Sequence, residues 1–247
     1  MSTQIRRRRV THAWPRPGLA ARLFATRSHY FSIENAAQTG LNPGTSDFSI
    51  DFWMNILGGS GTRVLFCKGA TSDLGGNHNG YLIFVNASNQ LQVAFSDDAN
   101  TTRLAITGPT ALTAGWHHCV FNFDRDADLQ ITVNNVVYHT AAISTRTGAC
   151  NPAAAFRIGS VSSNSSPTPG AFFDGLIDIV RYRSRLMSTF EITRSWYGGY
   201  GLVFPELTVG ERIGLVSDWE FDGFARDSQL INHLTNNNGV IFMGGKR

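Results

Sequence analysis

The stretch from Gly115 to Asn135 constrains the fold of this chain more than any other feature of its sequence. It contains two runs in which apolar and polar residues alternate, Trp116 to Phe123 and Leu129 to Val133, joined by a charged connection. Side chains on a β-strand point alternately to its two faces, and a short polar connection between two such runs closes a β-hairpin. The stretch therefore predicts an antiparallel pair of strands.

Both faces of the first run carry apolar residues. One face would hold Trp116, His118, Val120 and Asn122, and the other would hold His117, Cys119, Phe121 and Phe123. A strand that is covered on both faces has this composition. We therefore expect the run to be a central strand packed between two sheets.

Similar short runs, bounded by turn residues, recur along most of the chain. Their spacing favours a β-sandwich over an alternation of strands and helices. A Ser188 to Glu191 capping box predicts one short helix that ends near Trp196, before two glycines. The predicted strands are residues 47–57, 63–68, 81–85, 90–96, 103–106, 116–123, 129–133, 136–139, 156–159 and 172–182.

Several of these segments resemble the laminin G-like and pentraxin-like domains of the concanavalin A type. Gly115-Trp116-His117-His118 is similar to their G-W-H-H motif, and the segment from Phe172 to Tyr182 is similar to their F-x-G-x-I-D-x-V-x-x-Y strand. The resemblance covers about residues 22–196 and implies an all-β fold, an antiparallel β-sandwich of the jelly-roll type with one short helix. In pentraxins a disulfide starts from the strand that residues 48–52 occupy here, but this strand has no cysteine.

The C-terminal segment 214–247 is out of place for this family. Its residues Leu215 to Asp222 resemble a segment that normally opens a laminin G-like domain, whereas here they close the chain. We expect residues 22–247 to form a single domain with this displaced segment. A circular permutation would restore the strand within one molecule, and strand exchange would place it in a neighbouring subunit; the sequence leaves both open.

The N-terminus is a basic arm, which we expect to be extended over residues 1–21 because two prolines fix extended geometry. Residues 1–27 hold seven arginines and no acidic residue, while the rest of the chain has 14 basic and 18 acidic residues, a net charge of −4. Such an arm contacts an acidic protein surface or nucleic acid, or is merely solvated. The predicted contact residues are Arg6, Arg7, Arg8, Arg9, Trp14 and Arg16.

Two groups of carboxylates and amides are candidates for calcium, a cation that prefers such oxygen ligands. Neither group has the spacing of a dedicated calcium loop, and Asp and Asn are common turn residues. We therefore expect no cofactor, with calcium as the alternative. The groups are Asp73, Asn77 and Asn79, and Asp97, Asp98 and Asn100.

Asp218, Glu220 and Asp222 are the strongest catalytic candidates, because alternate residues on a strand would share a face about 6 to 7 Å apart. Retaining glycosidases use two carboxylates about 5 to 5.5 Å apart. Laminarinase-type members of the fold use E-x-D-x-E on one strand, whereas the order here is D-x-E-x-D. We expect no hydrolase activity. His117 and His118 are adjacent and point to opposite faces, so they cannot chelate one ion together.

The chain is globular rather than disordered, with 42% hydrophobic and 16% charged residues. Cys67 and Cys119 lie in apolar strand patterns, so we expect buried thiols. No apolar run reaches transmembrane length, and residues 1–9 lack the apolar core of a secretory signal. We therefore expect a location in a virion or another assembled particle, or otherwise the cytoplasm at synthesis, and no membrane partner.

From these features we expect a noncatalytic structural or binding module of a larger assembly. A phage or virus particle suits it best, with docking through the arm and other subunits, including copies of itself, as partners. The alternatives are a free-standing glycan-binding lectin, with or without calcium, and a glycoside hydrolase. Exposed aromatic residues would form a sugar platform, but we expect each candidate to lie in the core: Trp14, Tyr30, Tyr197 and Tyr200.

Overall fold

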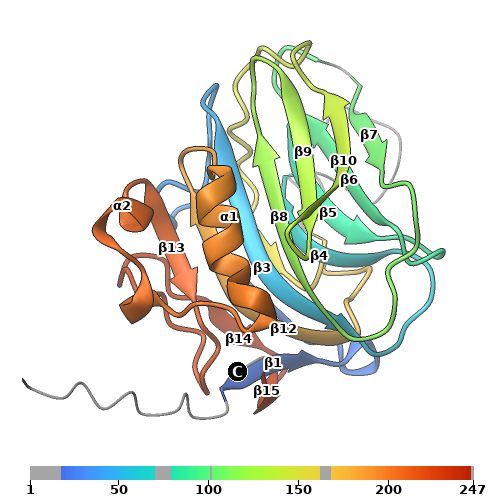
Figure 1. Cartoon of the computed structure of the whole chain (residues 1–247). Coiled ribbons are helices and arrows are strands. Elements are labelled where there is room, and N and C mark those ends of the chain that lie inside the picture. Colours follow the sequence, from blue (N-terminus) through green and yellow to red (C-terminus); the bar gives the residue numbers. More distant parts are fainter. Residues whose placement is uncertain (1–17, 70–78, 101, 162–167, 246–247) are drawn as a thin grey trace, which may run out of the picture.

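The computed structural model describes residues 18–69, 79–100, 102–161 and 168–245. These residues form two antiparallel β-sheets that face each other and enclose the core (Figure 1). The fold is therefore the all-β sandwich of the jelly-roll type that the sequence predicts. No helix in the described residues is long and apolar enough to cross a membrane.

One sheet has eight strands in the described part of the chain. Their order is β10-β9-β8-β3-β12-β1-β15, and β13 also pairs with β12. The strands are β1 (Leu19–Leu23), β3 (Phe48–Ile56), β8 (Trp116–Phe123), β9 (Asp128–Val133), β10 (Val136–Ala142), β12 (Gly175–Arg183), β13 (Leu215–Trp219) and β15 (Ile241–Gly244).

The facing sheet has seven strands among the described residues, in the order β14-β2-β11-β4-β5-β6-β7. All neighbouring strands in both sheets run antiparallel, and short turns join β5 to β6, β8 to β9 and β9 to β10. The strands are β2 (Tyr30–Ile33), β4 (Arg63–Lys68), β5 (Gly80–Val85), β6 (Leu91–Ser96), β7 (Leu104–Thr107), β11 (Phe156–Ile158) and β14 (Thr235–Asn237).

Two short helices follow β12. The predicted helix is α1 (Thr189–Trp196), and its capping box is present: Ser188 Oγ accepts a hydrogen bond from the Glu191 amide at 3.3 Å, and the Glu191 carboxylate accepts one from the Ser188 amide at 2.9 Å. A second, one-turn helix, α2 (Val209–Arg212), begins with the same kind of box at Thr208. α2 was not predicted from the sequence, although Thr208 and Glu211 have the spacing of a capping box. The 3-10 turns are Ala25–Arg27, Tyr197–Gly199 and Phe204–Glu206.

Phenylalanine rings fill the space between the sheets. Phe48 and Phe123, on neighbouring strands, stack at 4.2 Å between ring centroids. Phe52 of one sheet lies 4.6 Å from Phe66 of the other. Aromatic pairs at these separations add attraction to the burial of apolar area, so they fix how the two sheets pack.

The expectation that β8 lies between two sheets is wrong. Its inner face packs in the core through residues such as Phe121, but its outer face is covered by α1 (Figure 1). Val120 packs there against Met187 and Ile192. A helix with one apolar stripe buries an outer sheet face as well as a second sheet does, so the residue pattern of β8 could not distinguish the two.

β1 and β13 lie end to end along one edge of β12. β1 pairs with residues 175–177, and β13 pairs with residues 180–183. The other edge of β12 pairs with β3. β14 adds to β2 and β15 adds to β1, so in this structure the C-terminal segment adds strands to both sheets of its own chain.

The first strand begins at Leu19, two residues before the predicted end of the arm, so residues 19–21 belong to the sheet. The two ends of the described chain meet there, because the Gly245 amide donates to the Gly18 carbonyl at 2.8 Å. The predicted arm contacts Arg6, Arg7, Arg8, Arg9, Trp14 and Arg16 lie outside the described residues.

The three cysteines are free and buried, which confirms the expectation for Cys67 and Cys119. Burial raises the pKa of the Cys150 thiol to about 12. A thiol in this state is a small apolar side chain rather than a nucleophile.

Candidate binding site

A cluster of buried polar side chains lies between the eight-stranded sheet and α1, and its composition suggests a catalytic triad. Ser195 Oγ donates to Asp51 Oδ2 at 2.8 Å and lies 3.3 Å from His118 Nε2. In a serine hydrolase the hydroxyl proton faces the histidine, and the serine is open to substrate. Here the proton goes to the carboxylate, and Ser195 is only 3% exposed. The cluster therefore has a structural role.

The charges of this cluster balance when Asp218 is included, because Arg181 pairs with Asp218 as well as with Asp51. Burial by itself raises the pKa of Asp51, but Arg183, His118 and Arg181 outweigh burial and hold that pKa well below its usual range. Burial lowers the pKa of His118, so the imidazole is neutral at pH 7. Asp51 is thus a buried carboxylate whose negative charge depends on two arginines.

The three carboxylates proposed for catalysis do not form a row. Asp218 is buried and accepts from Arg181 Nε at 2.9 Å. β13 ends at Trp219, and Phe221 has a left-handed backbone with φ of 54°. The alternation of side chains stops at that turn.

Glu220 and Asp222 are engaged by the main chain. The Glu220 carboxylate accepts from the Phe204 amide, and Asp222 Oδ1 accepts from the Leu19 amide at 3.0 Å. Together with the buried Asp218, these contacts use the carboxylates to hold loops and strands in place.

The second group of calcium candidates is bound within the protein. Asp97 accepts from the Asn100 side chain at 2.5 Å and from the Gly148 amide at 2.8 Å, and Asp98 accepts from the Ala149 amide at 2.7 Å. In the described residues no three side chains of histidine, cysteine, aspartate or glutamate are grouped so that they could hold a metal ion. Of the first group, Asn79 lies just before β5, and Asp73 and Asn77 are outside the described residues.

The two adjacent histidines point to opposite faces of β8, as the strand geometry predicts. His118 lies in the buried cluster. His117 Nε2 is 2.9 Å from the Thr113 carbonyl, and its Nδ1 is 3.2 Å from Asn134 Nδ2. A neutral imidazole with its proton on Nε2 satisfies both contacts, so His117 joins the loop before β8 to the turn after β9.

The expectation that the tyrosines lie in the core is wrong for two of them. Tyr197 and Tyr200 are 57% and 69% exposed. Both lie in a glycine-rich turn after α1, where a residue pattern gives no information on tertiary cover. Tyr30 is half-buried beside Phe172, with the Arg157 guanidinium over its ring. Trp14 lies outside the described residues.

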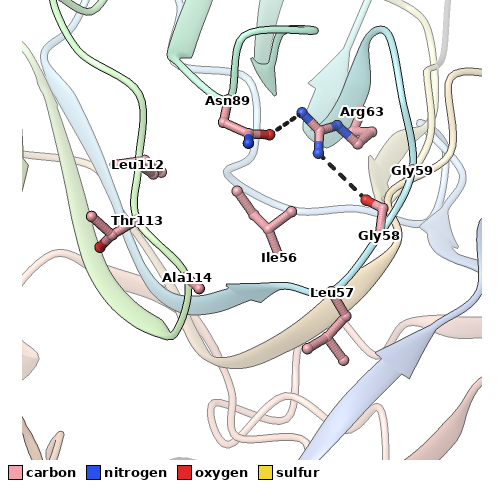
Figure 2. Close-up of a pocket in the computed structure, with 9 residues that line it drawn as sticks. All are labelled: Ile56, Leu57, Gly58, Gly59, Arg63, Asn89, Leu112, Thr113 and Ala114. Carbon is pink, nitrogen blue, oxygen red and sulfur yellow. Dashed lines mark hydrogen bonds between the residues drawn. The ribbon is translucent and has the colours of Figure 1, made fainter.

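A pocket of about 240 Å³ opens at one end of the sandwich, and we call it the rim pocket. Three segments from distant parts of the sequence form it: the turn that follows β3, the turn between β5 and β6, and the loop before β8 (Figure 2). The lining residues are Ile56, Leu57, Gly58, Gly59, Arg63, Asn89, Leu112, Thr113 and Ala114.

Arg63 organises the polar side of the rim pocket. Its guanidinium is buried and donates to the Asn86 carbonyl at 2.6 Å, to Asn89 Oδ1 at 2.7 Å and to the Gly58 carbonyl at 3.4 Å. Asn89 has a left-handed backbone with φ of 60°, and its carbonyl accepts from the Leu112 amide at 2.8 Å. Asparagine tolerates this conformation better than most residues.

These contacts leave one side of the Asn89 amide for a ligand. Its oxygen is turned to Arg63, and Figure 2 shows its nitrogen directed into the pocket, toward Ile56. Because main-chain and side-chain bonds both fix Asn89, the two N–H donors are oriented in advance. Ile56 and Leu112 give the pocket an apolar wall.

Arg63 is the charged residue that lines the rim pocket, and the Asp174 side chain lies against the lining residue Gly58. Burial lowers the pKa of Arg63 from its ordinary value, but a guanidinium remains protonated in proteins. Within the described residues no ion pair involves Arg63, and no carboxylate lines the pocket. The site therefore suits a ligand rich in hydrogen-bond acceptors.

A model of a laminin G family, described as the concanavalin A-like lectin/glucanases superfamily, matches residues 26–193. The match includes the rim pocket and stops before α2 and the three C-terminal strands. A search of curated protein sequences found no match.

Solved structures with the same fold include lectin-like proteins and one enzyme. A proposed carbohydrate binding protein from Bacteroides ovatus has a TM-score of 0.66 and 16% identity; the alignment covers 92% of this chain and 60% of that protein. A heptameric pentraxin from Limulus polyphemus has a TM-score of 0.56 and 10% identity; the alignment covers 92% of this chain and 94% of the pentraxin. The NanB sialidase of Streptococcus pneumoniae has a TM-score of 0.51 and 16% identity; the alignment covers 71% of this chain and 27% of the sialidase. At these identities the likeness is one of fold alone.

Proposed function

Because the chain belongs to a laminin G family of the concanavalin A-like lectin/glucanases superfamily, we propose that it is a noncatalytic glycan-binding module. The observation that carries this proposal is the rim pocket, where Arg63 fixes Asn89 with its amide donors directed inward. A sugar presents oxygen acceptors beside apolar C–H surfaces. The pocket offers the complementary pair, oriented N–H donors beside the side chains of Ile56 and Leu112.

The uses of the carboxylates support a noncatalytic role. Glycoside hydrolysis needs two carboxyl groups that both reach the sugar. Asp218 is buried against Arg181, and Glu220 and Asp222 accept backbone amides. A protein of similar fold is described as a proposed carbohydrate binding protein, which supports the binding part of the proposal.

A glycan array tests the proposal, followed by calorimetry of the best glycan with the full chain and with Asn89→Gly. Glycine accepts the left-handed backbone of Asn89 and removes the amide. Loss of one or two hydrogen bonds of about 0.5 to 1.5 kcal/mol each predicts about a 3- to 100-fold weaker affinity. The matched control is Asn238→Gly, which is also left-handed, with φ of 62°, and should bind normally.

Three results would overturn the proposal: no bound glycan, equal binding by Asn89→Gly, or hydrolysis of a bound glycan. The array is run with calcium and with chelator. If binding needs calcium and Asn89→Gly binds normally, the glycan does not bind at the rim pocket. The alternative is then a calcium-dependent lectin, with its calcium site among Asp73, Asn77, Asn79, Asp97 and Asp98.

We also infer that the module works within a larger assembly, with a phage or virus particle as its setting. The basic arm supports this role, because Arg6 to Arg9 form a block of four arginines with no acidic residue in the first 27. Light scattering with mass determination tests it. Self-assembly of the full chain that weakens when the four arginines become serine supports the inference, and a monomer in both cases rejects it.

A further inference from the structure

We propose that the rim pocket is one of two adjoining sugar subsites, so that the ligand is an oligosaccharide of at least two linked sugars rather than a single sugar. This inference rests on the proposed glycan-binding function and names the class of glycan. A hollow of about 340 Å³ beside the rim pocket forms the second subsite, and we call it the hairpin pocket. It is lined by residues 109–113, by His117 of β8 and by five residues of the β9–β10 hairpin.

The two pockets share part of their wall. Leu112 and Thr113 line both of them, and Figure 2 shows these two residues on a loop that lies across the rim pocket from Arg63. Pockets that hold small ligands in proteins measure about 300 to 1,000 Å³. The rim pocket, at about 240 Å³, is below this range, and the hairpin pocket, at about 340 Å³, is near its lower end. A ligand that fills both pockets is therefore larger than one that the rim pocket holds alone.

The shared loop, residues 109–113, is held in place from several sides. His117 Nε2 donates to the Thr113 carbonyl at 2.9 Å, and the Tyr138 hydroxyl donates to the Thr110 carbonyl. A third bond joins the loop to the turn between β5 and β6, which also forms the rim pocket. Because β8, β10 and this turn all fix the loop, both pockets have their shape before a ligand binds.

Asn134 in the hairpin pocket has the same features as Asn89 in the rim pocket. Both have a left-handed backbone, with φ of 50° at Asn134 and 60° at Asn89. Asn134 Oδ1 accepts from the His118 amide at 2.9 Å, and its Nδ2 lies 3.2 Å from His117 Nδ1. These bonds fix the side-chain amide and use one of its two N–H groups. In the part of the chain that the structure describes, the second N–H has no acceptor, so it is a donor for a sugar oxygen.

Apolar side chains form the rest of the hairpin pocket. Val136 and Val137 line it and are 67% and 57% exposed. The ring of Tyr138 lies so close to Gly108 that a Cβ on this glycine would overlap it, which fixes the ring in the wall. Exposed valines alone would suit many partners, but the fixed amide and the shared loop favour a second sugar. The two pockets thus present the same pair of features, an oriented N–H donor beside an apolar wall.

Calorimetry with glycans of increasing length tests the inference on the full chain. The probes are fragments of the best-bound glycan of the array that contain one and three sugars. The unchanged chain should bind the three-sugar fragment at least about tenfold more tightly than the single sugar, because only the longer fragment reaches both pockets.

The apolar wall is tested by Val136→Ser with Val137→Ser. The three-sugar fragment should bind about threefold or more weakly, and the single sugar should bind as before, because neither valine lines the rim pocket. The matched control is Leu230→Ser with Ile231→Ser, which are 75% and 52% exposed and lie outside both pockets. The control should bind both fragments normally, and circular dichroism checks that both variants fold.

The amide donor is tested by Asn134→Gly. Glycine accepts the left-handed backbone, and loss of one hydrogen bond should weaken binding of the three-sugar fragment about 2- to 10-fold. Asn135→Gly is the matched control, because Asn135 lies in the same turn with φ of 65° and does not line the hairpin pocket. It should bind the fragment normally.

The outcomes separate this inference from the proposed function. If no glycan binds, both are overturned. If the single sugar binds as tightly as the three-sugar fragment and Asn89→Gly weakens both, the rim pocket stands and the second subsite is rejected. A preference for the longer fragment that neither the valine variant nor Asn134→Gly reduces selectively also rejects the hairpin pocket. A selective loss of the longer fragment in either variant, with normal binding by its control, supports the second subsite.

Discussion

The rim pocket and the C-terminal region, residues 190–245, expose different groups to solvent. At the rim pocket a buried guanidinium holds the side-chain amide of one asparagine in place. In the C-terminal region charged groups pair with arginines, and large apolar side chains are exposed. A site for a small polar ligand needs oriented donors, whereas a protein interface needs apolar area. The two regions therefore differ in the kind of ligand for which they are suited.

The largest expected effect is at the buried cluster that joins the eight-stranded sheet to α1. Asp51 in β3 contacts Arg183 in β12 and Ser195 in α1. Asp51→Ala leaves buried arginines without a carboxylate, so we expect a loss of about 3 to 5 kcal/mol in the free energy of unfolding, measured by urea denaturation. Asp126→Ala in the exposed turn is the control, with a change within about 0.5 kcal/mol. A loss below about 1 kcal/mol for Asp51→Ala would mean that the contacts of Asp51 do not hold α1 against the eight-stranded sheet.

The next largest effect is expected in the β-sandwich, where the free energy of unfolding should respond to high pH through Lys68. Burial lowers the pKa of Lys68 to about 8 from 10.5. The unfolded chain then binds one more proton at Lys68 than the folded chain between these values, so the contribution of Lys68 to stability rises with pH from about 8 to about 10.5, by up to about 3 kcal/mol.

Lys68→Met removes this titration. The difference in unfolding free energy between the unchanged chain and Lys68→Met should therefore rise in favour of the unchanged chain across that pH range. A difference that is flat from pH 8 to pH 10.5 contradicts the prediction.

A smaller response, at low pH, belongs to the C-terminal region. Burial raises the pKa of Glu191, but hydrogen bonds from Arg185 and Ser188 outweigh it and lower the pKa to about 2 from 4.5. This contribution is present above pH 4.5 and is lost as the pH falls toward 2. We expect about 1 kcal/mol, because the helix end is partly open to solvent and the ion pair is screened. Glu191→Gln should be about 1 kcal/mol less stable than the unchanged chain at pH 7. This difference should be smaller at pH 3, and thermal melts measure it at both pH values.

The smallest effect should come from the exposed side chains themselves. Phe224→Ser changes a residue that is 65% exposed, so the free energy of unfolding of the monomer should change by less than about 0.5 kcal/mol. The measurement is urea denaturation at a concentration below that of self-association. A loss above about 1 kcal/mol would show that Phe224 packs within its own chain, and it would contradict the exposed position of its side chain.

Much of the sandwich could be predicted because its signals are local. The alternation in residues 116–133 and the strand from Gly175 to Arg183 depend on neighbouring residues alone, and the capping box of α1 needs only Ser188 and Glu191. The cover over β8 and the exposure of Tyr197 could not be predicted, because both depend on which distant segment packs there.

The rim pocket shows this limit most clearly. Arg63 begins a predicted strand, and arginines are expected at the surface, so nothing in the sequence marks it as buried. Asn89 stands in an ordinary polar turn. Its role depends on Arg63, 26 residues away, and on the loop at Leu112, a pairing that no local pattern records.

The shared edge of β12 also sets an order of events during synthesis. β2 and β12 each pair with a strand from the last 33 residues. β14 pairs with β2, and β13 pairs with β12. A ribosome releases the chain from its N-terminus, so most of the sandwich emerges before either edge can close. Pairs so distant in sequence close late and slowly. Since β15 also pairs with β1, the nascent chain exposes three open strand edges until residues 215–244 have been made, and a chain that stops before them keeps these edges open.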